Sequence, residues 1–304
     1  MEKPVETSTD TSKRRWGQAR RLAFIDLRLQ YDARINRRDL IDFFDISTPQ
    51  ASADLSLYQV LAPDNLRYDA SLRVYVAGDS FQPIFGRTSA TSYLDEIHRV
   101  ARNVVEPGES FVGFTPPTGV VATPVRAIEA SEVAVLVRAI RDQKALRVVY
   151  QSMDDPNPRE RVITPHAFGF DGLRWHARAW CHQRRVFRDF AIGRLAVTGA
   201  ADTADTIEPK ADVGWYTVVQ VVLIPHPKLS SSQRTVVMHD YGMTNARLLL
   251  SCRKAMLFYT LRHLNLESAE VVDNPASQHV IVENRAEVDR WADEDRAGTA
   301  GVSP

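Results

Sequence analysis

The chain has little cysteine: only Cys181 and Cys252 occur among its 304 residues. Two cysteines so far apart do not make a disulfide framework, so a reducing cytoplasm is the expected compartment. No run of about 18 apolar residues occurs, which excludes a membrane-spanning helix. The first residues, MEKPVETSTDTSKRRWGQ, also lack the apolar segment of a secretory signal. We therefore expect a cytoplasmic protein without a membrane partner.

The common motifs of catalytic sites are also missing. There is no phosphate-binding Gly-x4-Gly-Lys-Ser/Thr loop, no His-Glu-x-x-His and no Gly-x-Ser-x-Gly. His176, Cys181 and His182 are neighbours in sequence but lack the paired spacing of a zinc site. The acids of this region are scattered, so no general acid/base pair is indicated. We predict that the protein is not an enzyme and holds neither a metal nor another cofactor.

The chain also has no formal net charge, because its 38 Lys and Arg balance its 38 Asp and Glu. These charges are nevertheless distributed unevenly along the sequence. Residues 11–40 contain nine Lys or Arg and three Asp, and residues 159–194 contain eight Arg and three acids. Residues 265–304 contain nine acids and three Arg. Two basic segments in an otherwise neutral chain favour two modules that face anions. The alternative is scattered charge on solvated surfaces.

The length predicts two or three domains, and the order of helical and alternating patterns predicts a multi-domain α+β protein. A helical segment comes first, then several short antiparallel strands typical of a small β-barrel or curled sheet, then a mixed α+β module. The predicted segments are a disordered tail at 1–15, a helical domain with two short strands at 16–80, a helical connector at 81–130, a mainly stranded domain at 131–200, an α+β domain at 214–290 and an acidic tail at 291–304.

The segment 16–80 has the pattern of a winged helix-turn-helix. A helix from Trp16 is followed by a short helix over 37–43, a turn at Phe44-Asp45-Ile46 and a third helix that begins near Ser47 and ends near Leu61. Two short strands over 66–77 would form the wing. In the third helix, one face carries Ala51, Leu55, Leu57, Tyr58 and Leu61 and is predicted to be buried.

The opposite face of the third helix is suited to DNA. Its side chains are small or carry hydroxyl and amide groups, which allows a helix to enter the major groove and a glutamine to pair with adenine. Arginines at the edges would hold the phosphate backbone. The alternative is a three-helix structural domain that contacts a protein. The predicted DNA-binding residues are Arg20, Arg37, Arg38, Ser47, Thr48, Pro49, Gln50, Ser52, Ser56, Arg67 and Arg73.

A second basic feature follows a hairpin signal at Asp171-Gly172, which predicts a type I′ turn. In the strand that leaves this turn, Leu173, Trp175, Ala177 and Ala179 fall on one face, which looks like core. Arg174, His176 and Arg178 fall on the other face. Cationic side chains gathered on a sheet repel one another, so an anion that binds there would explain them.

The later strand VFRDFAIGRL places Arg188 and Arg194 on one face, with Val186, Phe190 and Ile192. If the faces of the two strands match, these arginines join Arg174, His176 and Arg178 in one anion-binding patch. The alternative is a solvated basic face that pairs with Glu160, Asp171 and Asp189. Tyr150, Ser152 and His166 on earlier strands would add hydrogen bonds or stacking.

The order of these modules resembles that of WYL-domain transcriptional regulators. The most specific parts are Tyr150-x-Ser152, Pro165-His166, the run DGLRWHARA and Phe187-Arg188-Asp189-Phe190. Within the family, the chain is similar to the BrxR/CapW-like repressors of bacterial phage-defence islands of the BREX and CBASS types. Where many members have Trp-Tyr-Leu, this chain reads Trp175-His176-Ala177, as that group does.

The resemblance implies an Sm/SH3-like β-barrel, a C-terminal WCX-type dimerisation module and a homodimer that represses a promoter through a palindromic operator at the bacterial nucleoid. It also implies a pocket that senses a nucleotide or single-stranded nucleic acid. The matching pocket residues are Tyr150, Ser152, His166, Arg174, His176, Arg178, Arg188 and Arg194. Two alternatives stay open: a nucleic-acid- or nucleotide-processing or accessory defence factor that uses the helix-turn-helix for targeting, and a scaffold without DNA affinity.

Overall fold

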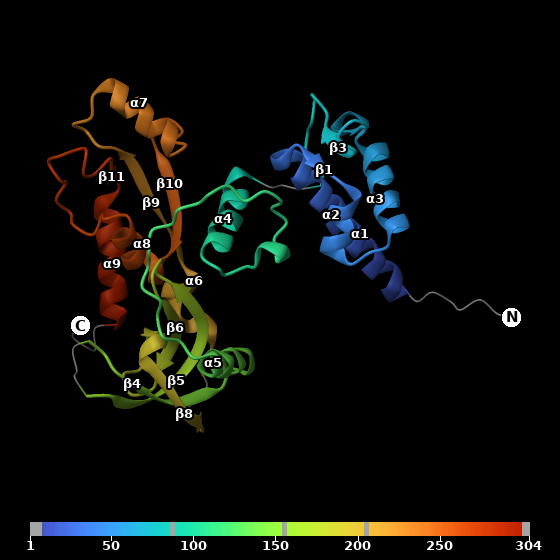
Figure 1. Ribbon diagram of the computed structural model, residues 1–304. Coiled ribbons are helices and arrows are strands. Elements are labelled where there is room, and N and C mark those ends of the chain that lie inside the picture. The colour runs from blue at the N-terminus through green and yellow to red at the C-terminus, as the bar shows by residue number, and fades with distance from the viewer. Residues whose placement is uncertain (1–7, 86–88, 154–156, 204–206, 300–304) are drawn as a thin grey trace. The chain divides into compact units, whose positions relative to one another are not determined.

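The computed structural model describes residues 8–85, 89–153, 157–203 and 207–299. It divides into two units, residues 1–122 and 123–304 (Figure 1). The predicted WYL and C-terminal segments therefore form one compact unit. None of the described helices is long and apolar enough to cross a membrane.

The N-terminal unit places helices against a small antiparallel sheet of order β1-β3-β2. Its helix α1 begins at Ser8, well before the Trp16 start predicted from the sequence, and residues 1–7 of the predicted tail lie outside the described residues. The elements are α1 (Ser8–Asp32), β1 (Arg34–Ile35), α2 (Arg37–Phe44), α3 (Thr48–Leu61), η1 (Pro63–Asn65), β2 (Leu66–Asp69), β3 (Val74–Ala77), α4 (Ala90–Ala101) and η2 (Pro107–Glu109).

Local signals define the tight turn between α2 and α3. Asn36 and Asp39 form a capping box at the start of α2, and Asp45 ends this helix in a left-handed conformation. Ser47 then caps α3 by accepting a hydrogen bond from the Gln50 backbone N–H at 3.3 Å. These caps give the helix-turn-helix its predicted boundaries.

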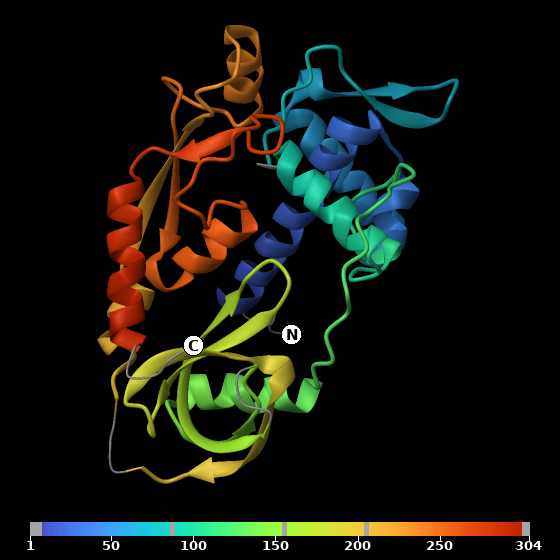
Figure 2. The same ribbon diagram turned by 90° about the vertical axis from the view of Figure 1, so that its left-hand side faces the viewer.

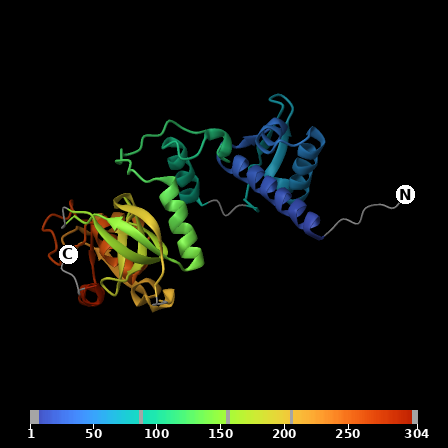
Figure 3. The ribbon, with the colours of Figure 1, turned by 90° about the horizontal axis from the view of Figure 1, so that it is seen from below.

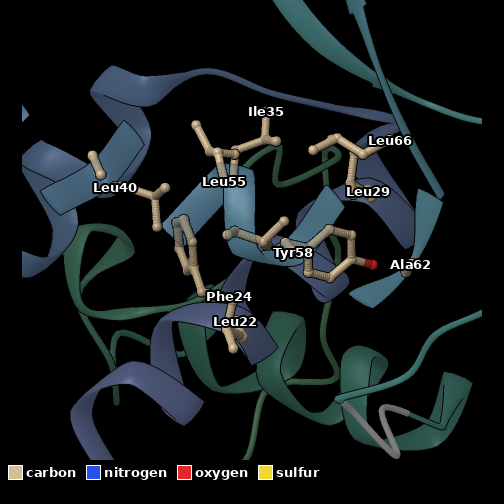
Figure 4. Close-up of a cluster of buried hydrophobic side chains, with 11 residues drawn as sticks. Leu22, Phe24, Leu29, Ile35, Leu40, Leu55, Tyr58, Ala62 and Leu66 are labelled. Atoms are coloured by element: carbon tan, nitrogen blue, oxygen red, sulfur yellow. The ribbon is translucent and has the colours of Figure 1, made fainter. Parts of the chain in front are cut away.

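The core of this unit lies between α1, α2 and α3 (Figure 4). Phe24 of α1, Leu40 of α2 and Leu55 of α3 are almost fully buried there. The Tyr58 hydroxyl donates to the carboxylate of buried Asp26. Leu61 was predicted to join this core but is half exposed, because it is the last residue of α3 and the chain turns away after it.

The second unit begins with α5 (Ala130–Asp142), which packs on a curled five-stranded sheet of order β7-β6-β5-β4-β8 (Figure 3). A closed Sm/SH3-like barrel is not confirmed, because β7 and β8 are not paired with each other among the described residues. The strands are β4 (Ala145–Tyr150), β5 (Arg159–Phe170), β6 (Trp175–Cys181), β7 (Val186–Ala191) and β8 (Leu195–Ala201), with η3 (Ile192–Arg194) before β8.

The rest of this unit is the predicted α+β module, a three-stranded antiparallel sheet of order β10-β9-β11 with helices against it (Figure 2). Its elements are η4 (Pro209–Ala211), α6 (Val213–Tyr216), β9 (Val218–Pro225), α7 (Ser231–Asp240), β10 (Leu248–Arg253), η5 (Lys254–Met256), α8 (Leu257–His263), β11 (Val280–Val282) and α9 (Arg285–Thr299).

Two boundaries of the module differ from the prediction. The spacing of Cys252, Met256 and Tyr259 predicts a helix that begins at Cys252. The helix α8 begins only at Leu257, because Cys252 is still in β10 and lies opposite Val219 of β9. The segment predicted as an acidic tail belongs to α9 as far as Thr299. Val288 of that helix is fully buried and Trp291 packs beside it, so α9 is anchored by apolar contacts.

Candidate functional site

The first candidate site is the exposed side of α3 in the N-terminal unit. Thr48, Pro49 and Ser56 are exposed and Ser52 is half-buried, whereas Ala51, Leu55 and Tyr58 point into the core. The predicted face is thus open, and its side chains are small. Such a surface lets the backbone of a helix come close to a flat or grooved partner.

Gln50 on this helix is held by a buried acid. Its amide nitrogen donates to Asp54 Oδ1 at 3.2 Å, and Asp54 Oδ2 also accepts a hydrogen bond from Arg21 Nε at 2.6 Å. The Asp54 side chain is fully buried, so this ion pair fixes α3 on α1 and sets the position of Gln50. The amide still has a second N–H and its carbonyl, the two groups that a bidentate contact with adenine uses.

The arginines predicted to hold the DNA backbone differ in their exposure and in the contacts that they already make. Arg37, Arg67 and Arg73 are exposed, and Arg73 has a left-handed backbone in the turn between β2 and β3. Arg38 is paired on the surface with Asp42 at 3.3 Å, and the Arg20 guanidinium lies 5.4 Å from the ring centre of Phe111. Exposed arginines around the open face of α3 suit backbone phosphates.

The second candidate site is the basic strand face of the curled sheet. Here Arg178 is buried and already paired: its Nε and Nη2 donate to the two oxygens of Asp212 at 2.7 and 3.0 Å. Its Nη1 donates to Asp189 at 3.4 Å. Asp212 precedes α6, so this arginine joins the curled sheet to the start of the C-terminal module.

Both histidines of the predicted pocket are also paired with carboxylates. His166 Nε2 lies 2.9 Å from Asp212, and His176 Nε2 lies 3.0 Å from Asp171. The His176 ring is 5.0 Å from that of Tyr259 on α8, whose hydroxyl donates to Asp189. The residues form a continuous polar network inside the second unit.

The acidity of these groups follows from their surroundings. Burial raises the pKa of Asp212, but hydrogen bonds from His166 and Arg178 and the charge of Arg178 outweigh it and hold that pKa at about 2. Burial likewise opposes ionisation of Asp171, yet hydrogen bonds from His176 and two backbone N–H groups lower its pKa. Burial and the charge of Asp189 raise the pKa of Tyr259. The network therefore contains ionised carboxylates beside a neutral tyrosine at physiological pH.

The two arginine strands do not share a face. The register pairs Arg178 with Asp189 and Ala179 with Arg188, so Arg188 lies on the opposite side of the sheet from Arg178. The prediction that the arginines of the two strands form one anion-binding patch is therefore wrong. The alternative of pairing within the domain is confirmed for Asp171 and Asp189.

The hairpin between β5 and β6 also differs from its prediction. Residues 171–174 form the connection, and Gly172 has a positive φ of 91° whereas Asp171 does not, which rules out a type I′ turn. Instead, Asp171 Oδ1 accepts the backbone N–H groups of Leu173 and Arg174. Leu173 and Trp175 are half exposed rather than core, because the sheet core extends only to Ala177 on this face.

Two of the predicted arginines meet in a separate pocket. Arg174 and Arg194 line a cavity of about 290 Å³ together with Trp175 and with Arg126 from the segment before α5. Tyr150 does not line this pocket but supports one of its walls: its hydroxyl accepts the N–H of the lining residue Ala191 at 3.4 Å, and its ring packs on Phe190. Ser152 follows β4 and is half-buried. Among the side chains described, no group of three or more His, Cys, Asp or Glu residues could bind a metal ion.

Three protein-family models match the chain in the predicted order. The BrxR transcriptional regulator winged helix-turn-helix domain matches residues 17–99, the WYL domain matches 132–198, and the BrxR transcriptional regulator C-terminal dimerization domain matches 218–288. A DNA-binding transcriptional repressor CapW of Stenotrophomonas maltophilia is 64% identical over 96% of this chain and 97% of its own length. The chain belongs to the CapW family of transcriptional repressors.

Other CapW proteins are more distant but similarly complete. The repressor of Escherichia coli (strain KTE188) is 43% identical over 90% of this chain and 91% of its own length. The repressor of Pseudomonas aeruginosa is 42% identical over 93% of this chain and 94% of its own length. CapW proteins are named as transcriptional repressors, which agrees with the prediction that this chain is not an enzyme.

Several residues of these sites escaped the sequence reasoning. Asp212 lies in the segment 201–213, whose Ala, Asp, Thr and Pro residues predict a linker between two domains. Tyr259 lies on a helix far along the chain, so no local pattern connects either residue with Arg178. Asp189, by contrast, was among the predicted partners, and alternation places it on the face opposite Arg188. Arg126 carries no signal at all in its Pro- and Thr-rich surroundings.

Proposed function

We propose that this chain is a homodimeric repressor that binds a palindromic operator through the exposed face of α3. The observation that carries the proposal is that face, with small, hydroxyl and amide side chains at the start of a capped helix. Exposed Arg37, Arg67 and Arg73 lie on α2 and the β2–β3 hairpin, and α2 and β2 contact α3. CapW relatives named as DNA-binding repressors support it. Base edges would be read by α3 and phosphates held by the arginines.

The dimer would use the C-terminal module, whose matched family description is a dimerization domain. Two-fold symmetry then places two α3 helices on half-sites about one helical turn of DNA apart, or a multiple of it. The regulated promoter would be that of a phage-defence operon of the BREX or CBASS type, and repression would take place in the bacterial cytoplasm, at the nucleoid. The names of the CapW relatives support repression. The phage-defence promoter and the nucleoid rest on the family resemblance of the sequence.

The effector would be a nucleotide or a single-stranded nucleic acid that binds to the WYL domain. The pocket lined by Arg126, Arg174 and Arg194 supports this class of ligand, because guanidinium groups form paired hydrogen bonds with phosphate and Trp175 offers a stacking surface for a base. Release of the operator requires that the effector binds the non-operator conformation more tightly.

Operator binding by the purified chain tests the proposal. Fluorescence anisotropy with duplex DNA from upstream of its own gene should show an affinity at least roughly 10³-fold above that for random duplex of the same length. Both affinities should fall as salt increases, because binding releases counterions. Equal affinity for both duplexes would rule out a specific repressor, and no salt-dependent binding at all would favour a scaffold.

A further inference from the structure

The pocket that holds Arg174 and Arg194 is built from three segments of the second unit. One wall is the chain before α5, from Val125 to Ile128; the second is Arg174-Trp175 at the start of β6; the third is the junction of β7 and β8 at Ala191, Gly193 and Arg194. The N-terminal unit ends at Ala122, and the predicted connector runs on to residue 130. The first wall is therefore the last part of this connector. The connector is therefore part of the site.

The charges in this pocket are poorly compensated. Arg174 has one carboxylate nearby, Asp171 Oδ2 at 3.9 Å, and its own buried Nε makes no hydrogen bond among the described atoms. In the described part of the chain, Arg126 and Arg194 have no carboxylate partner. Three guanidinium groups that line one cavity of about 290 Å³ favour an anionic ligand, and a phosphate group can accept paired hydrogen bonds from them.

The connector is seated closely on the sheet at this point. A Cβ atom at Gly193 would lie 3.0 Å from the carbonyl oxygen of Ala127, so the two backbones approach more closely than most side chains allow. Ile128 packs against the sheet core, whereas Val125, Arg126 and Ala127 are exposed. The segment is thus anchored at Ile128 and exposed to solvent on its N-terminal side.

We infer that a phosphate-bearing effector binds between Arg126 on one side and Arg174 and Arg194 on the other, and so fixes the connector on the WYL domain. The base of a nucleotide would stack on Trp175, which is half exposed and is braced by Phe170 at a ring distance of 4.9 Å. Occupancy of the pocket then restrains the chain that leads to the DNA-binding unit. This inference rests on the proposed effector class and adds the route by which binding is transmitted.

The probe for the test is a short fluorescein-labelled single-stranded DNA oligonucleotide, added to the full-length chain. Arg126→Ala and Arg174→Ala should each weaken its binding by roughly ten-fold or more, the loss expected for a hydrogen-bonded charge. Arg147→Ala removes the same charge from an exposed site on β4 outside the pocket and should leave binding unchanged. Gly193→Ala keeps all three arginines but pushes on Ala127, and should also weaken binding.

Limited trypsin digestion gives a second readout of the connector. The probe should slow cleavage after Arg126 several-fold and leave cleavage after Arg102, which is exposed at the end of α4, unchanged. If Arg174→Ala weakens binding but Arg126→Ala does not, and Arg126 stays unprotected, the connector plays no part and the effector proposal survives. If the probe does not bind the unmodified chain, or if Arg174→Ala leaves its binding unchanged, the proposed effector site is wrong and the inference falls with it.

Discussion

Arg178 and Asp212 form a two-pronged ion pair inside the second unit, with Nε–Oδ2 and Nη2–Oδ1 distances of 2.7 and 3.0 Å. Both side chains are almost fully buried. The same carboxylate accepts the Trp215 backbone N–H at 3.1 Å and so caps α6. Asp212 therefore connects Arg178 of strand β6 in the WYL domain with helix α6 of the C-terminal module. The guanidinium of Arg178 is already used in this ion pair.

Replacing Asp212 with alanine should destabilise the second unit strongly. The change leaves Arg178 buried with a weaker partner, and loss of one member of a buried pair costs about 3–5 kcal/mol. Urea unfolding followed by tryptophan fluorescence measures it. Asp273→Asn is the matched control, because Asp273 pairs with Lys228 on the open surface and its loss should leave the unfolding midpoint nearly unchanged. Equal midpoints for both variants would contradict a structural role for Asp212.

The same ion pair should make stability depend on acid. The folded-state pKa of Asp212 is about 2, below the ordinary value of 3.8, so the unfolded chain binds this proton more readily. The contribution of the carboxylate, on the order of 2 kcal/mol, is therefore complete above about pH 4 and is lost as the pH falls toward 2. Urea unfolding of the original chain and of Asp212→Asn should show a difference that shrinks over this window. A difference that stays constant with pH would contradict it.

Gln50→Ala should reduce operator specificity. If Gln50 pairs with an adenine, its loss should weaken operator binding by about 1–3 kcal/mol and leave binding to random duplex unaltered. Asp54 keeps its ion pair with Arg21, so α3 should stay in place and circular dichroism should be unchanged. Anisotropy titrations on both duplexes separate the outcomes. An equal loss on both duplexes would indicate that Gln50 reads no base.

Arg37→Ala should behave in the opposite way. Arg37 is exposed at the first residue of α2, and a phosphate contact from it is independent of sequence. Binding to operator and to random duplex should weaken by the same factor, and the slope of log affinity against log salt should fall by about 1. An unchanged slope would place Arg37 outside the interface.

The helices and their caps can be predicted from the sequence, whereas the candidate pocket can be predicted only in part: Arg174 and Arg194 were expected there and Arg126 was not. Ser47, Pro49 and the apolar spacing of α3 predict the helix-turn-helix, because caps and periodicity act within a few residues. The face on which Arg188 lies depends on which residue of β6 it opposes, and a shift of one residue reverses it. Arg126 and Asp212 come from segments without regular patterns. Only the fold brings Arg126 beside Arg174 and Asp212 beside Arg178.

Gly172 provides a test of how tightly the hairpin packs on α8. Its φ of +91° disfavours any side chain, and a Cβ there would lie 2.7 Å from Nδ1 of His263. Gly172→Ala should therefore lower the free energy of unfolding by roughly 1–3 kcal/mol from backbone strain, with a further loss from the clash. Gly199→Ala is the control, because no heavy atom of the residues that the structure describes lies within 4 Å of the new Cβ and the φ of Gly199 is not positive. The double change Gly172→Ala with His263→Ala removes the clash and keeps the strain, so it should destabilise less than the two single changes added together. Strict additivity in urea unfolding would show that the turn and His263 do not press on each other.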